Sequence, residues 1–169
     1  MIAKEELGGA GAWAAILACG GLGAVGGSLI ALRLRPQRLL LASVLFALPV
    51  VLQLVVLALE APTALVAGVN LFVGAGVALH LTYWFTVFQQ QVPAHAQSRV
   101  SSYDALGSFV LIPIGTALVG PAAIAFGRSE TLWLAALIST LCFVGILSVR
   151  AVWTLRAKDV PAVDSGSVG

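Results

Sequence analysis

Five long stretches with almost no charge constrain this chain more than any other feature of its sequence. They are the segments 10–32, 39–59, 64–89, 101–126 and 132–152. Each is long enough to cross a bilayer as a helix, which takes roughly 20 apolar residues. Runs this long and continuous favour helices over the short alternating strands of a membrane β-barrel. We therefore expect an all-α integral membrane protein, a bundle of five transmembrane helices.

The composition excludes a soluble globular domain. Hydrophobic residues make up 60% of the chain, charged residues 9%, and the mean hydropathy is +1.03. Too few polar side chains remain to cover a soluble surface. Cys19 and Cys142 both lie inside apolar stretches, where we expect small buried hydrophobic residues rather than a disulfide or metal ligands. We expect no cofactor and no bound metal.

Glycine and proline are concentrated inside the expected spans. Gly23 and Gly27 form a small-xxx-small pair in the first span, which predicts tight packing against a neighbouring helix. Pro49 predicts a kink in the second span. In the fourth span, further packing positions are expected at Pro113, Gly115, Gly120 and Pro121. Helices so rich in these residues suit parts of a membrane protein that move.

Basic residues predict the orientation in the membrane. With five spans, one side receives Arg33, Arg35, Arg38, Arg99, Arg150, Arg156 and Lys158, and the other receives Lys4 and Arg128. The richer side is expected to be cytoplasmic, which leaves the N-terminus outside the cell membrane. Residues 1–9 lack the pattern of a signal peptide and are expected as an extracytoplasmic lead. Residues 157–169 are expected as a disordered cytoplasmic tail.

The third span carries a stripe of polar and aromatic residues. Asn70, His80, Trp84 and Gln91 fall within roughly a third of a turn of one another on a helix. Such a stripe suits a helix that lines a substrate path. The alternative is a hydrogen-bond seam that only joins two helices.

The stretch 89–121 holds most of the concentrated polarity of the chain. It reads as a cytoplasmic loop followed by the fourth span, and GRSET, residues 127–131, as the turn after that span. Asp104 is expected one turn inside the start of the fourth span, near Arg99, where the helix macrodipole favours an anion. Asp104 is then either a first-turn acid or, with Arg99, a cytoplasmic gate whose pairing changes between conformations.

No enzymatic chemistry is expected. The tetrapeptide at Gly26, Gly27, Ser28 and Leu29 matches loosely the pattern of intramembrane serine proteases, with His80 at a comparable depth. Such a match arises readily by chance in a glycine-rich span, and no oxyanion-hole loop accompanies it. The sequence also has no phosphate-binding glycine loop, metal-ligand cluster or nucleic-acid patch.

The order and spacing of three motifs resemble the C-terminal half of a major facilitator superfamily transporter of the bacterial drug or siderophore exporter type. The motifs are the glycine-rich first span ending in RLRPQR, the long third span followed by QQQVPAHAQSRV, and the fourth span with PIGTALVGP. The resemblance implies that the five spans correspond to helices 8–12 of a twelve-helix transporter. It also implies alternating access, with two halves rocking about a central cavity.

This resemblance implies a function and a partner. Arg99 and Asp104 occupy the place where contacts at the cytoplasmic end of the eleventh helix hold the outward-open state. Five spans with no first half predict a truncated transporter, one that exports small amphipathic molecules only with its N-terminal half or a second chain. The partners expected are thus the lipid bilayer, that half and a small-molecule substrate. The alternative is a small structural membrane protein whose polar residues only fix helix packing.

Overall fold

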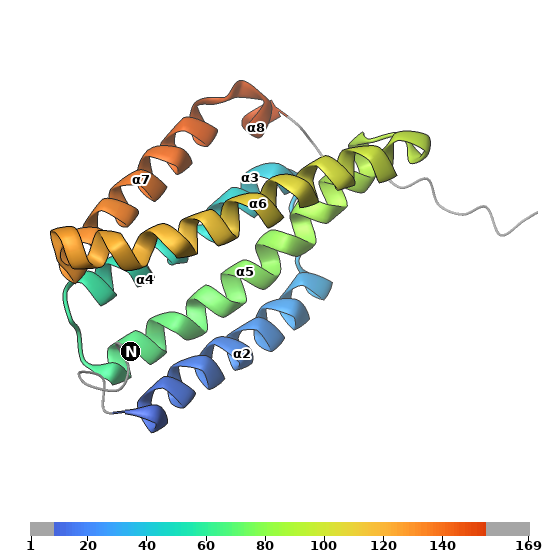
Figure 1. Ribbon diagram of the computed structural model, residues 1–169. Helices are drawn as coiled ribbons and strands as arrows, with labels where there is room; N and C mark the ends of the chain where they lie inside the picture. The colour runs from blue at the N-terminus through green and yellow to red at the C-terminus, as the bar shows by residue number, and fades with distance from the viewer. Residues whose placement is uncertain (1–8, 155–169) are drawn as a thin grey trace, which may run out of the picture.

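The computed structural model describes residues 9–154, and leaves the side chains of Ala94, Asp104, Ser108 and Ala151 undescribed. The helices are α2 (Ala10–Arg33), α3 (Leu39–Ala47), α4 (Pro49–Ala58), α5 (Thr63–Gln91), α6 (Ala94–Phe126), α7 (Arg128–Ser148) and α8 (Arg150–Thr154) (Figure 1).

Five segments are long and apolar enough to cross a membrane, namely α2, α3 with α4, α5, α6 and α7. The prediction of an all-helical chain with five candidate spans is confirmed for the described residues. Residues 1–8 of the expected lead and the expected tail at 157–169 lie outside those residues.

Helix α5 is the centre of the bundle, because it packs against α2 on one side and against α3 and α4 on another (Figure 1). One buried cluster joins α2, α4 and α5 around Ile16, Val56 and Val66. A second joins α3 and α5 around Leu39, Leu79 and Tyr83. Helix α7 packs on α4. Most other apolar side chains are exposed, as expected of helices whose outer faces contact lipid.

Glycines bring α2 and α5 into backbone contact. A methyl group at Gly23 would lie 2.8 Å from the carbonyl carbon of Leu71, and one at Gly27 would lie 2.7 Å from Cα of Ala75. On the facing helix, a methyl group at Gly74 would lie 3.0 Å from the backbone nitrogen of Ala24. Ordinary contacts between such atoms are about 3.5–4.0 Å. At these three positions only glycine fits unless the facing backbone moves.

Pro49 divides the second span into α3 and α4 without ending it. Leu48, between the two helices, keeps helical dihedral angles of φ −56° and ψ −34°. Proline has no N–H and its ring displaces the carbonyl four residues earlier. The backbone N–H of Leu48 instead donates to the carbonyl of Leu45 over 3.3 Å. The result is one irregular span.

Two regions expected as loops are helical instead, so the helices begin earlier than the expected spans. Helix α6 begins at Ala94 rather than Ser101, directly after Val92 and Pro93. Polarity suggested a loop here, but Gln and Arg are good helix formers and polar side chains do not prevent a helix. Likewise, the turn expected over 127–131 is confined to Gly127, whose φ is +96°.

Helix α6 stands apart from the rest of the bundle. Its main contact is with α7, the helix that follows it after Gly127. Every residue between 98 and 121 whose side chain is described is exposed. The long helix that carries Arg99 and Asp104 therefore has almost no neighbour among the described residues.

Candidate functional site

Asn70 on α5 bonds to α2. Its Nδ2 donates to the backbone carbonyl of Ile16 over 2.6 Å. A methyl group at Gly20 would lie 2.6 Å from the same nitrogen, so that glycine makes room for the amide. Asn70 thus serves as a link between α2 and α5.

His80 on α5 bonds to α3. Its Nδ1 lies 2.9 Å from Oγ and 3.0 Å from the carbonyl oxygen of Ser43. The Ser43 hydroxyl is also 3.3 Å from the carbonyl oxygen of His80. With the ring proton on Nδ1, His80 donates to both the hydroxyl and the carbonyl oxygen of Ser43, and the Ser43 hydroxyl donates to the His80 carbonyl. Ser43 has no exposed surface.

The remaining members of the stripe make no such link. Trp84 is 37% exposed, and Gln91 is exposed at the last residue of α5. The depression at the end of α2, lined by Leu29, Ile30, Leu32 and Arg33, contains none of the four residues. Asn70 and His80 turn to different helices, so the described part of the chain does not gather the stripe around one cavity.

Ser28 and His80, the two residues of the loose serine-protease pattern, do not bond to each other. The Ser28 hydroxyl donates to the Ala24 carbonyl of its own helix over 2.8 Å, and His80 pairs with Ser43 instead.

The expected gate lies deeper in its helix than the sequence suggested. Because α6 begins at Ala94, Asp104 is not in its first turn. The macrodipole acts within the first turn only, so the reading of Asp104 as a first-turn acid is wrong. The Asp104 side chain is among those left undescribed, and Arg99 is exposed. The hydroxyls of Ser101 and Ser102 donate to the Ser98 carbonyl over 3.1 and 2.7 Å.

The packing candidates on α6 differ from those on α2. Pro113 and Pro121 are exposed, and methyl groups at Gly115 and Gly120 would meet no atom within 4 Å. Thr116 donates to carbonyls of its own helix, over 3.0 Å to Ile112 and 2.9 Å to Pro113. These positions have no described helix against them.

The sequence interpretation missed residues whose role depends on a second helix. Ser43 is the buried partner of His80, Gly74 faces α2, and the Tyr83 hydroxyl donates to the Leu34 carbonyl over 3.2 Å. Gln53 has a buried Oε1 with no partner among the described residues. A small polar residue in an otherwise apolar span, such as Ser43 or Gln53, was the available signal.

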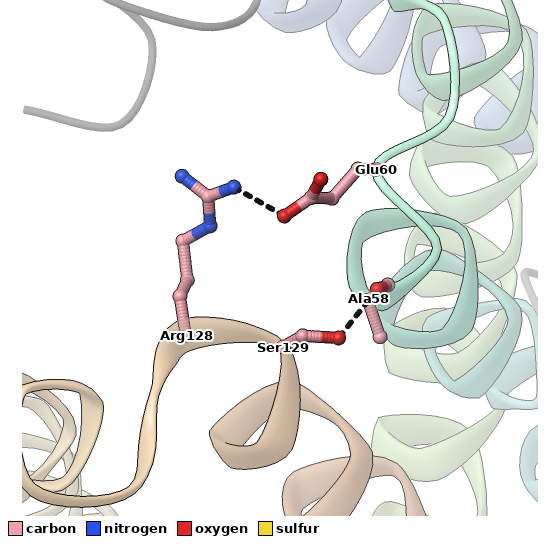
Figure 2. Close-up of polar contacts among 4 residues, drawn as sticks. All are labelled: Ala58, Glu60, Arg128 and Ser129. Carbon is pink, nitrogen blue, oxygen red and sulfur yellow. Dashed lines mark hydrogen bonds and ion pairs between the residues drawn. The ribbon is translucent and has the colours of Figure 1, made fainter.

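A polar contact also joins the start of α7 to the turn between α4 and α5 (Figure 2). Nη2 of Arg128 donates to Oε1 of Glu60 over 2.8 Å. Beside it, the Ser129 hydroxyl donates to the Ala58 carbonyl over 2.8 Å. These contacts hold α7 against the end of α4.

Comparisons of the chain with protein-family models, with curated proteins and with solved structures gave no match. The resemblance to transporter halves therefore rests on the sequence motifs.

Proposed function

We propose that the chain is the membrane half-module of a secondary active transporter, similar to a major facilitator exporter of small amphipathic molecules. It works with an N-terminal half or a second chain. The observation that carries this proposal is the isolation of α6, whose described residues between 98 and 121 are all exposed.

The physical reason is the cost of polar groups in lipid. Helix α6 carries Arg99, Asp104 and a run of serines at one end, and two prolines further along. Charged groups in a membrane helix normally face protein or a water-filled path. Nothing in the described bundle offers α6 such surroundings, so a second half supplies them. Rocking of α6 against that half opens and closes the path, with Arg99 and Asp104 as the gate.

A second candidate is a structural membrane protein without transport. It is favoured by the bonds of Asn70 to Ile16 and of His80 to Ser43, which join helices and engage two of the four residues expected on a substrate path. In that case Arg99 and Asp104 only mark the end of a membrane span, at the level of the lipid headgroups.

Export of a fluorescent cationic dye from cells that hold the chain with its partner half distinguishes the two candidates. Asp104→Asn removes the charge and keeps the shape, so it should abolish or strongly slow export while the protein level stays near normal. Arg99→Ala should act similarly. The matched control is Arg150→Ala, another exposed arginine, which should leave export unchanged.

The double variant tests whether Arg99 and Asp104 act together. We expect coupling of about 1 kcal/mol or more, above the roughly 0–1 kcal/mol of an ordinary surface pair. Full export by both single variants would refute the gate role of Arg99 and Asp104 and favour the packing interpretation of this stretch. Export no faster than in cells without the chain would refute the transport proposal.

A further inference from the structure

Three exposed arginines mark the turn between α2 and α3, and none has an acidic partner among the described residues. Arg33, Arg35 and Arg38 are all exposed. The sequence has no Asp or Glu between Glu6 and Glu60. In the part of the chain that the structure describes, no carboxylate pairs with any of the three. Within residues 9–154, the turn therefore presents a positive charge that no carboxylate offsets.

The backbone of this basic turn, residues 33–38, is held in place at both ends. The N–H of Leu34 donates to the Ile30 carbonyl over 2.9 Å, and the N–H of Ala42 donates to the Arg38 carbonyl over 3.0 Å. The Tyr83 hydroxyl donates to the Leu34 carbonyl from α5. The buried side chain of Leu39 anchors the exit. A fixed backbone lowers the entropic cost of gathering three guanidinium groups on one ligand.

An apolar surface lies directly beneath the basic turn. Leu29, Ile30, Leu32 and Arg33 line the depression at the end of α2. Because Arg33 is the last residue of a candidate span, we expect the turn at headgroup level and the depression at the level of the acyl chains. The site thus combines positive charges that suit a lipid headgroup with apolar side chains that suit an acyl chain.

We propose that the basic turn binds an anionic phospholipid. Arg33, Arg35 and Arg38 bind its phosphate, because guanidinium groups donate paired hydrogen bonds to phosphate oxygens. An acyl chain lies along Leu29 and Leu32. This site is independent of the proposed transport function, since neither Arg99 nor Asp104 takes part.

Native mass spectrometry of the purified full chain tests the proposal, with phosphatidylglycerol and phosphatidylcholine as probes. Phosphatidylglycerol should bind at least about tenfold more tightly. Each arginine near an anionic lipid contributes enough for about a fivefold change in affinity. Arg35→Gln should therefore weaken binding of phosphatidylglycerol about fivefold, and the Arg33→Gln/Arg35→Gln double variant roughly 30-fold. The matched control, Arg150→Gln, removes one exposed arginine at the start of α8 that does not line the depression, and it should change binding less than twofold.

Two further measurements test whether the ligand is a lipid. One asks whether a free anion competes for the site, and the other asks whether the apolar depression contributes to binding. Inorganic phosphate at equal concentration should not displace the lipid, and Leu29→Ser should weaken lipid binding. Displacement by inorganic phosphate would show a simple anion site and overturn the proposal. Equal binding of the two lipids, or an equal effect of Arg35→Gln and Arg150→Gln, would overturn it as well. Circular dichroism of each variant checks that the helices are intact.

Discussion

A single methyl group added to the seam between α2 and α5 should separate the two helices. In Gly23→Ala the new carbon would lie 2.8 Å from the carbonyl carbon of Leu71 and 3.1 Å from the backbone nitrogen of Ala75. The carbonyl oxygen of Leu71 would lie closer still. Restoring a carbon–carbon distance of about 3.5 Å alone requires roughly 0.7 Å of separation. All three obstructing atoms belong to backbone, so no side chain can rotate away to relieve the contact.

The cost follows from the contacts that this separation weakens. A gap of about 0.5–1 Å forfeits roughly a quarter to a half of the attraction between two atoms, and the whole seam opens together. Overpacked sites cost about 1–3 kcal/mol, and we expect Gly23→Ala near the upper end, since α2 and α5 also meet at Gly27 and Gly74.

The matched control is Gly21→Ala on the same helix, where a methyl group would meet no atom within 4 Å. Replacing glycine by alanine in a helix changes the intrinsic propensity by about 1 kcal/mol in both variants, so this contribution cancels in the comparison. The measurement is the unfolding free energy in detergent micelles, followed by circular dichroism during titration with a denaturing detergent. Equal stabilities of the Gly23→Ala and Gly21→Ala variants would refute the reasoning.

Three further predictions concern single contacts and the orientation. A double-mutant cycle with Ser43→Ala and His80→Leu should give a coupling of about 0.6–1.7 kcal/mol in unfolding free energy, the range for hydrogen bonds between membrane helices; additive losses would show that the 2.9 Å contact contributes nothing. Glu60→Gln should cost less than about 1 kcal/mol, and less still at high salt, because the Glu60 side chain is 62% exposed; a loss that high salt does not reduce would contradict a screened surface pair. A single cysteine at Gln37 in the basic turn should resist an impermeant thiol reagent added to intact cells, and labelling there would reverse the predicted orientation.

The number and type of the spans could be predicted because they depend on local properties of the chain. A long uncharged run can satisfy its backbone in lipid only as a helix, and this argument needs no knowledge of neighbouring segments. The break at Pro49 was predictable for the same kind of reason, since a proline disturbs its own helix. The start of α6 was not, because polarity over 94–100 marks contact with water and does not distinguish a loop from an exposed helix.

The partners of the polar residues were decided by the tertiary structure alone. Helical periodicity placed Asn70 and His80 on one side of α5, but it cannot say which helix lies opposite each. Ile16 receives one bond and Ser43 the other, because Gly20, Gly23 and Gly74 draw α2 against α5 while α3 packs beside it. Sequence determines which face of a helix a residue occupies. What that face meets depends on close packing between segments far apart in the chain, and for α6 the described residues provide almost no neighbour at all.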